Sequence, residues 1–376
     1  MASGFSGTSG AREYNFMLKP LVAGSFDEQL AWLDTALQAA LQERGLDRRC
    51  IAFKRFFCSN LPGHVEALQR HANSSSSEIG SGGVSVIIQP PVEPATVTLW
   101  VYCVRDHSRL GHVSGNGSSF SLRRNGMEHV WSSGLICPDQ HGSHDQTLAI
   151  FERYVDFLEQ RGMTLQDNCL RTWFYVIDVD NNYGGFVDAR NKVFQRFGLT
   201  PETHYIASTG IQGSGIDPRA LVMMDAYAIK GVKTGQIRHL KALDHLSDTH
   251  VYGVAFERAT QVSYRDRRHI IVSGTASIDS SGAVVHDGDV SRQLDRTLEN
   301  IAALLARAEA TLDDMQHFIA YVRNPDDADI VHELLGRRVS DKPFLVVTGP
   351  VCRPDWLVEI EGIAITANDD PSLPSF

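Results

Sequence analysis

The sequence has 376 residues, of which 43% are hydrophobic and 21% charged, and its 35 Lys and Arg against 45 Asp and Glu give a net charge of −10. This composition is typical of a globular protein with enough apolar residues for two or three domains, and it excludes a fibre or a disordered tail. No basic run with interleaved aromatic residues is present, so we expect a small-molecule partner rather than nucleic acid or an anionic membrane.

The cysteines predict no metal site and no disulfide framework. None of the six lies in a CxxC motif or at a spacing to histidine that is typical of zinc, and most fall in apolar runs. The N-terminal stretch lacks the basic start and apolar centre of a signal peptide, and no apolar segment of about 20 residues is present. We therefore expect reduced thiols in a cytoplasmic protein. Whether it is a monomer or a homodimer stays open.

The same order of elements, helix, strand, helix, strand, strand, occurs three times along the chain. Each copy opens with an amphipathic helix, over 27–44, 145–161 and 291–308. The remaining elements are expected at 50–60, 62–72, 82–91 and 95–106 in copy one, at 169–181, 186–198, 203–211 and 220–229 in copy two, and at 315–324, 328–338, 342–350 and 356–365 in copy three.

Short motifs repeat together with this order. MTLQDN (163–168) matches ATLDDM (310–315), and STG (208–210) matches VTG (347–349). Hairpin patterns at 119–136 and 254–278 precede copies two and three. Only a Gly/Ser-rich stretch precedes copy one, so its hairpin is expected to be shortened or irregular. Linkers are expected at 105–117 and 231–250, and a mobile loop at 74–83. The predicted units are therefore 1–110, 111–235 and 236–376.

Each unit predicts an α+β layer, with two helices on one face of a sheet and the other face still apolar. Three such sheets can bury their apolar faces against one another. The expected architecture is a pseudo-trimeric β-barrel with the helices outside, and its ligand clefts are expected where adjacent units meet.

The strand 356–365 carries two acids, Glu359 and Glu361, in an apolar run. Residues two apart project from one face of a strand. A carboxyl group in apolar surroundings is paired or has a raised pKa, so these acids are candidates for chemistry. The alternative is that both face water or bind an arginine.

Further candidates lie nearby in the sequence. Arg353 is either a ligand for a substrate carboxylate or a surface turn residue, and Cys352 is a pocket residue, a nucleophile or simply packing. Gly274, Thr275 and Ala276 at a strand end either offer N–H groups to a ligand or form a bulge. Arg171 and Tyr175 share one face of a copy-two strand and are candidates for a cleft wall, or for core packing.

HIIVSGTASI (269–278), ATLDDMQHFIAYVRN (310–324) and LVEIEGIAI (357–365) resemble the RidA/YjgF superfamily of reactive-intermediate deaminases, homotrimers of a chorismate-mutase-like unit. SGTASI (273–278), HDGDVSRQLDRTLENI (286–301) and PVCRPDWLVEIEG (350–362) resemble the chorismatases, which remove the enolpyruvyl group of chorismate.

The sequence also departs from the deaminase pattern. Counted back from the EIE triplet, the substrate-binding arginine of the deaminases falls on Phe344, and Tyr205 takes the equivalent place in copy two. Met223 stands in copy two where copy three has Glu359. The cleft that contains Glu359 is therefore expected to be the active one.

The resemblance implies a chorismatase-like lyase or hydrolase in which Glu359 protonates the enolpyruvyl methylene carbon. Thr348, Phe344, Cys352 and the segment 274–276 would shape the pocket. No metal or organic cofactor is expected. Two alternatives stay open: a RidA-like enzyme that acts on an imine or enamine in a natural-product pathway, and a non-catalytic binding protein of the same fold.

Overall fold

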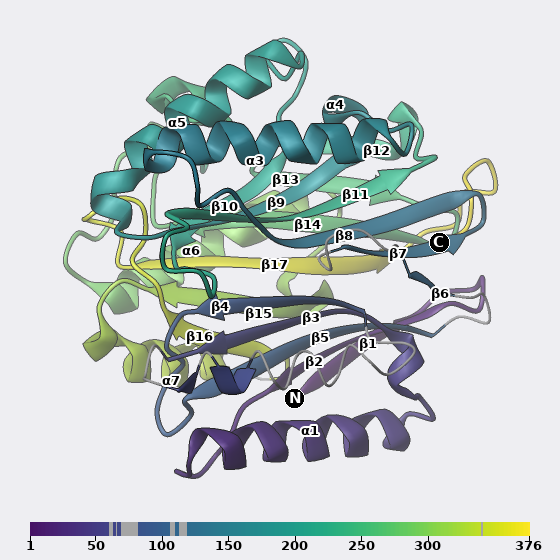
Figure 1. Cartoon of the computed structure of the whole chain (residues 1–376). Helices are drawn as coiled ribbons and strands as arrows, with labels where there is room; N and C mark the ends of the chain where they lie inside the picture. Colours follow the sequence, from purple (N-terminus) through teal and green to yellow (C-terminus); the bar gives the residue numbers. More distant parts are fainter. Residues whose placement is uncertain (60–62, 65, 69–81, 106–109, 113–118, 340) are drawn as a thin grey trace.

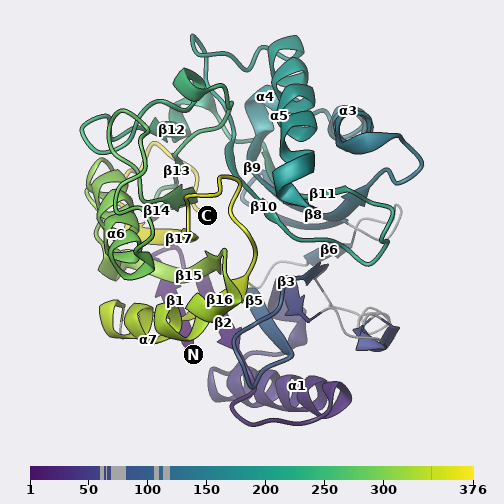
Figure 2. The same cartoon turned by 90° about the vertical axis from the view of Figure 1, so that its left-hand side faces the viewer.

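The computed structural model describes residues 1–376 apart from 60–62, 65, 69–81, 106–109, 113–118 and 340. The helices lie outside three β-sheets, which face one another at the centre of the molecule (Figures 1 and 2). The helix predicted over 62–72 and the loop predicted over 74–83 lie mostly outside the described residues. The helices around the sheets include α1 (Phe26–Glu43), α3 (Gly142–Glu159), α4 (Leu165–Asn168), α5 (Val179–Arg196), α6 (Val290–Ala306) and α7 (Ala328–Arg338).

The three sheets share the order of five strands, and the second and third sheets have one additional edge strand. The order reads β1-β2-β5-β3-β4 in the first sheet, β6-β7-β8-β11-β9-β10 in the second and β12-β13-β14-β17-β15-β16 in the third. The first sheet comprises β1 (Ala2–Ser6), β2 (Arg12–Leu18), β3 (Ile51–Cys58), β4 (Gly83–Ile88) and β5 (Val97–Arg105). The second comprises β6 (Leu110–His112), β7 (Ser119–Arg124), β8 (Met127–Ile136), β9 (Cys169–Val176), β10 (Ala207–Gln212) and β11 (Val222–Lys230). The third comprises β12 (Ile237–Leu240), β13 (Ala259–Ser263), β14 (Arg267–Ala276), β15 (Met315–Val322), β16 (Phe344–Thr348) and β17 (Val358–Ala367).

Three sequence expectations need correction. The Gly/Ser-rich beginning forms a regular antiparallel hairpin of β1 and β2. Both predicted linkers contain an edge strand, β6 and β12, because each lies beside a hairpin strand with free backbone groups. Helix α5 begins at Val179, seven residues before its predicted start, so the strand predicted over 169–181 ends at Val176.

One glutamine in the first turn of each long helix holds the chain just before the last strand of its unit. Gln29 donates to Pro94 O (3.0 Å) and accepts from Thr96 N (2.8 Å). Gln146 makes the same pair of bonds with Arg219 O (3.0 Å) and Leu221 N (2.8 Å), and Gln293 makes it with Asp355 O (2.9 Å) and Leu357 N (2.9 Å). The three copies thus share a buried polar contact as well as a strand order.

Three equivalent backbone hydrogen bonds join the sheets to one another. Ile88 N donates to Ser214 O (2.8 Å), Gln212 N to Pro350 O (3.0 Å) and Thr348 N to Pro90 O (2.7 Å). Each sheet therefore donates to the next one and accepts from the previous one.

The contacts of Gln212 and Thr348 also correct the internal alignment. Gln212 pairs with Val176 and Thr348 with Val322, at the same end of their sheets. Thr209 therefore corresponds to Leu345, and the match of STG with VTG is wrong by three residues. By the same register Ser208, and not Tyr205, takes the place of Phe344.

Candidate active site

Glu359 lies on the central strand β17 of the third sheet and is 4% exposed. Its carboxyl group lies against Gly274, where a Cβ atom would come within 1.9 Å of Glu359 Oε1. The pairing of β14 with β17 is irregular between Val272 and Thr275, so Gly274 lies in a bulge. The bulge and the missing side chain together make room for the acid. The Gly274 N–H donates to Thr209 Oγ1 (2.9 Å), so the structure supports the bulge interpretation of this segment.

The surroundings of Glu359 favour its protonated form. Burial raises the pKa of Glu359 to about 8, and the charge of Glu361 acts in the same direction, against Arg171 and Arg258. Among the described residues, none hydrogen-bonds to this carboxyl group. A carboxylic acid that keeps its proton at neutral pH can act as a general acid.

Glu361, two residues further on, has a different environment. It accepts hydrogen bonds from Trp173 Nε1 (2.8 Å), Tyr321 OH (3.1 Å) and the hydroxyl of Thr209, and it forms an ion pair with Arg171 at 2.5 Å. Three of these four partners come from the second sheet, so Glu361 ties the two sheets together.

Glu359 lines a cavity formed by residues of the second and third sheets and their connections. The cavity has a volume of about 30 Å³, which is room for roughly two waters. A larger ligand requires the cavity to widen, and the exposed turn around Arg353 is the part of the wall that faces solvent. The lining residues are Tyr183, Arg190, Ser208, Gly210, Val254, Phe256, Arg258, Gly274, Ala276, Cys352, Arg353, Trp356 and Glu359.

Arginines from three segments meet at this cavity. Arg190 lies on α5, Arg258 just before β13 and Arg353 in the turn before β17. Arg258 donates to the backbone oxygen of Ser247 (3.1 Å), and Arg353 lies over the ring of Trp356 (5.4 Å). These cations line the same cavity as Glu359, whose pKa is raised by burial, so the cavity favours an anionic ligand.

Cys352 packs in the wall as a neutral thiol. Burial, and next the negative charge of Glu359, raise its pKa to about 12, and its side chain hydrogen-bonds to Tyr183. Because the thiolate is the nucleophile, this environment disfavours covalent catalysis by Cys352.

The structure brings only some of the proposed site residues together. Glu359, Gly274, Ala276, Cys352 and Arg353 line the cavity, whereas the remaining candidates do not. Thr275 donates to Ser273 O (3.0 Å) inside the bulge, Thr348 takes part in the backbone bonds between sheets, and Phe344 packs against His332 (5.0 Å). Arg171 binds Glu361, and Tyr175 lies beside Arg55 (5.6 Å).

Some residues of the site, contributed by the second sheet and α5, were not predicted from the sequence. Tyr183 falls between the strand predicted over 169–181 and the helix predicted over 186–198. Arg190 lies on the buried face of α5, between Phe186 and Val193. An arginine on an otherwise apolar helix face is the signal that could have identified it.

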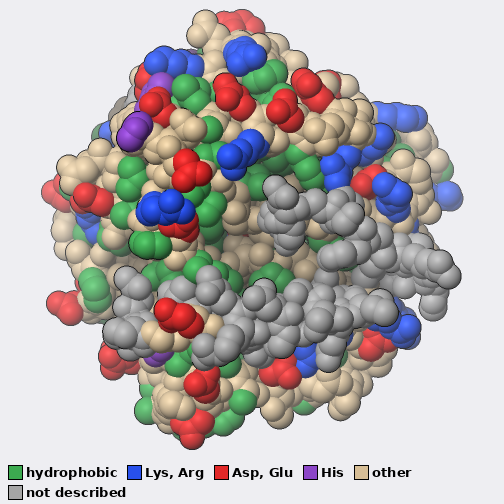
Figure 3. Space-filling view, viewed as in Figure 1, with side chains coloured by type: hydrophobic (Ala, Val, Ile, Leu, Met, Phe, Trp, Pro, Cys, Tyr) green, Lys and Arg blue, Asp and Glu red, His purple; other side chains and the backbone are tan. Residues whose placement is uncertain are grey.

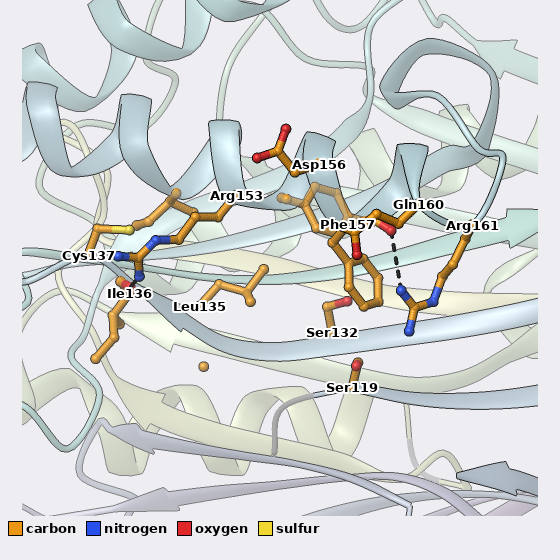
Figure 4. A pocket seen from close by; sticks show the side chains of 13 residues that line it. Ser119, Ser132, Leu135, Ile136, Cys137, Arg153, Asp156, Phe157, Gln160 and Arg161 are labelled. Atoms are coloured by element: carbon orange, nitrogen blue, oxygen red, sulfur yellow. Dashed lines mark hydrogen bonds between the residues drawn. The ribbon is translucent and has the colours of Figure 1, made fainter. Parts of the chain in front are cut away.

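A larger pocket lies between α3 and β8 (Figure 4). Its arginines are occupied with backbone oxygens, since Arg153 donates to Ile136 O (3.3 Å) and Arg161 to Phe157 O (3.3 Å). Asp156 is the one acid in its wall.

No helix within the described ranges has the length and apolar character needed to cross a bilayer. In the same part of the chain, no three His, Cys, Asp or Glu side chains are grouped so that they could hold a metal ion. Acidic and basic side chains are mixed over the face shown in Figure 3.

Comparison with known proteins shows the family to which this chain belongs. The family model Endoribonuclease L-PSP matches residues 255–366. A RutC family protein of Pyrococcus abyssi is 31% identical over 97 residues, which are 25% of this chain and 76% of the relative. This chain belongs to the RidA/YjgF superfamily.

Two further matches extend over most of this RidA-superfamily chain. A 3-hydroxybenzoate synthase of Streptomyces hygroscopicus is 25% identical over 267 residues, 63% of this chain and 74% of the relative. A crystal structure of chorismatase superposes with a TM-score of 0.65 and 19% identity, over 94% of this chain and 98% of that one. The second match shows that the whole chain shares the chorismatase fold.

Proposed function

We propose that this RidA-superfamily protein removes the enolpyruvyl group of chorismate, or of a related cyclic enol ether, with Glu359 as the general acid. The observation that carries the proposal is a buried carboxyl group, with a pKa raised to about 8, in a cavity lined by three arginines. The similarity to a 3-hydroxybenzoate synthase and to a chorismatase supports the same choice.

The proposed reaction begins at the methylene carbon of the enolpyruvyl group. Glu359 gives its proton to this carbon, the π electrons form the new C–H bond, and the ether oxygen shares the positive charge of the resulting oxocarbenium ion. Water then attacks the cationic carbon, and its proton passes to the Glu359 carboxylate. The hemiketal then breaks at its C–O bond, which releases pyruvate and the ring alcohol.

The arginines fit the charge of such a substrate. Chorismate carries one carboxylate on its ring and another on its enolpyruvyl group, and guanidinium groups bind carboxylates in a planar, two-point geometry. Arg190 from the second unit and Arg258 and Arg353 from the third would hold the two ends. The substrate would thus lie across the junction of the two units.

We also propose that the chain is a single-chain pseudo-trimer around a β-barrel, with units 1–110, 111–235 and 236–376. The shared strand order, the three glutamine contacts and the three backbone hydrogen bonds between sheets support this arrangement. The reaction as written needs no metal or organic cofactor, so activity should survive exhaustive dialysis against a chelator.

The test is incubation of the purified protein with chorismate, with pyruvate measured by lactate dehydrogenase and the ring product identified by mass spectrometry. We expect stoichiometric pyruvate together with a hydroxybenzoate or a dihydroxycyclohexadienoate. An inactive Glu359→Gln sample is the control for spontaneous decay of chorismate. No pyruvate above that control, together with hydrolysis of imines formed from amino acids, would contradict the proposal and favour a deaminase.

A further inference from the structure

The cavity that contains Glu359 is smaller than the proposed substrate. Its volume is about 30 Å³, whereas pockets for small-molecule ligands commonly enclose about 300–1,000 Å³. A ligand of that size therefore requires one wall to move. Two segments face each other where the second and third units meet at this cavity: residues 180–185 of α5, which include Tyr183, and the turn 352–355, which begins with Cys352 and Arg353.

Arg323, directly after β15, links these two segments. Its Nη2 atom donates to both carboxylate oxygens of Asp180 (2.7 Å each), and its Nη1 atom donates to the backbone oxygens of Val351 and Arg353. The side chain of Arg323 is 14% exposed and that of Asp180 is 53% exposed. Neither Arg323 nor Asp180 lines the cavity, so the pair acts on the site through the segments that it joins.

Residues 180–185 have little intrinsic tendency to form a helix. They read DNNYGG, and Asn and Gly are poor helix formers. All six are exposed or half-buried, whereas Val179 and Phe186 on either side are fully buried. Asp178, just before the helix, has a left-handed φ of 47° and makes no side-chain cap. Such a segment between two buried anchors can open locally while the rest of the fold stays intact.

The turn 352–355 has a further attachment within its own unit. Gln293 donates to Asp355 O (2.9 Å) and accepts from Leu357 N (2.9 Å), so the end of the turn is fixed to α6. Displacing the turn breaks these bonds as well as those to α5. Movement of residues 180–185 therefore costs less.

We propose that residues 180–185 are a lid over the cavity, that the ion pair of Asp180 with Arg323 holds it closed, and that a ligand enters beneath Tyr183 when this pair breaks. Asp180 and Arg323 are thus positioning residues. The side chain of Tyr183 hydrogen-bonds to Cys352, so opening of the lid uncovers the thiol. That the ligand is chorismate rests on the proposed function, whereas the opening itself does not.

The rate at which N-ethylmaleimide labels Cys352 measures the opening, because the lid covers this half-buried thiol. Asp180→Asn keeps the shape of the side chain and removes its charge, so the latch weakens and labelling should become about three- to tenfold faster. Mass spectrometry of the peptides follows each cysteine separately.

Asp188→Asn is the matched control. Asp188 also lies on α5, its side chain is 57% exposed, and its partner Lys192 belongs to the same helix (2.7 Å). Labelling of Cys352 should be unchanged in this variant. Cys103, fully buried in the first sheet, reports global unfolding and should react equally slowly in all samples. Unchanged labelling in Asp180→Asn, equal acceleration in Asp188→Asn, or parallel acceleration at Cys103 would overturn the proposal.

Hydrogen exchange is a second measurement, which does not depend on the ionisation of a thiol. The backbone amides of 181–186 should exchange faster in Asp180→Asn than in the wild type, and those of α6 should not change. Equal exchange of 181–186 in the two proteins would contradict the lid.

Chorismate separates the lid from the proposed reaction. If it is the substrate, it should slow the labelling of Cys352, and Asp180→Asn should raise KM about three- to tenfold with little change in kcat, because the closed state is disfavoured while Glu359 stays in place. Faster labelling in Asp180→Asn without any effect of chorismate would support the lid and contradict the proposed substrate. Protection by chorismate with equal labelling of both proteins would do the reverse.

Discussion

Glu359 and Glu361 lie on the same strand, but their carboxyl groups differ in their hydrogen-bond and ion-pair partners. Glu361 has four donors, three of them from the neighbouring sheet, whereas Glu359 faces the backbone of Gly274 and a cavity. Spacing in the sequence places both acids on one face of β17. It cannot tell which one is paired, because the partners lie up to 190 residues away in the chain.

Glu359→Gln should lower kcat by roughly 10²–10⁴ with little change in KM, since it removes the proton donor and keeps the shape of the site. Steady-state pyruvate release on a folded sample measures this. Glu361→Gln is the comparison: it should mainly lower stability, because Arg171 loses its counter-ion, and should change turnover per folded molecule much less. Near-full turnover in Glu359→Gln would assign the acid to another residue.

The pH dependence of activity should follow the ionisation of Glu359. The protonated form is the active one, so kcat/KM should fall as the pH rises through about 8, where the carboxyl group titrates. Rates from pH 5.5 to 9.5 in buffers of constant ionic strength provide the measurement. An alkaline limb that stays in place when Glu359 is replaced by Asp or Gln would belong to another group.

The same ionisation predicts an effect on stability that needs no substrate. An unfolded glutamate loses its proton near pH 4.5, and folded Glu359 keeps its proton until about pH 8. Stability therefore declines as the pH rises from 4.5 to 8, by a few kcal/mol in total. Glu359→Gln should raise the melting temperature more at pH 8 than at pH 5. An equal effect at both values would show that the carboxyl group is not held protonated.

At the scale of elements, periodicity predicted the long helices and the central strands within a few residues. The edge strands β6 and β12 were assigned to linkers, because three or four residues carry no usable alternation and their pairing depends on a neighbouring hairpin. Helix α5 was predicted too short, since its first turns contain Asn181, Gly184 and Gly185, which favour loops. As a result, Tyr183 on α5 was not recognised as a residue of the cavity wall.

Substitutions of the repeated glutamine can distinguish an effect on stability from an effect on activity. Gln293→Leu and Gln29→Leu each remove the shared pair of hydrogen bonds together with the other bonds of the same side chain, so each should lower the free energy of unfolding by about 2–3 kcal/mol in urea titrations. Gln293 holds the turn that carries Cys352 and Trp356, so only its variant should also lower kcat/KM. Equal losses of activity per folded molecule would show that the turn does not position the site. Gln42→Leu, on the exposed face of α1, is the neutral control.

At the scale of the whole molecule, buried ion pairs between arginine and a carboxylate join neighbouring sheets. Arg171 binds Glu361 between the second and third sheets, and Arg55 binds Asp225 (2.8 Å) between the first and second. Between the first and third, the ring of Trp100 lies against His317 (4.6 Å). Arg267 also forms a buried ion pair with Glu13 between the first and third sheets, so each of the three junctions contains at least one buried ion pair.

Arg55→Met should destabilise the protein by about 3–5 kcal/mol, because Asp225 is then left buried without its counter-ion. Adding Asp225→Asn should recover much of this loss, since the amide needs no cation. Thermal unfolding of the two single variants and the double variant measures the coupling. A double variant as unstable as the sum of its parts would show that the pair does not act as a unit.

Because three similar sheets are joined within one chain, a buried acid that lowers stability can be present in one sheet and absent from the other two. In an assembly of three identical chains, a buried acid that weakens folding above pH 4.5 would be present three times. Here the strand registers place Met223 and Thr98 where the third sheet has Glu359. In a single chain, the destabilisation by the buried carboxyl group therefore occurs once instead of three times. The residues at the other two junctions can then differ from those of the candidate site and contribute to stability alone.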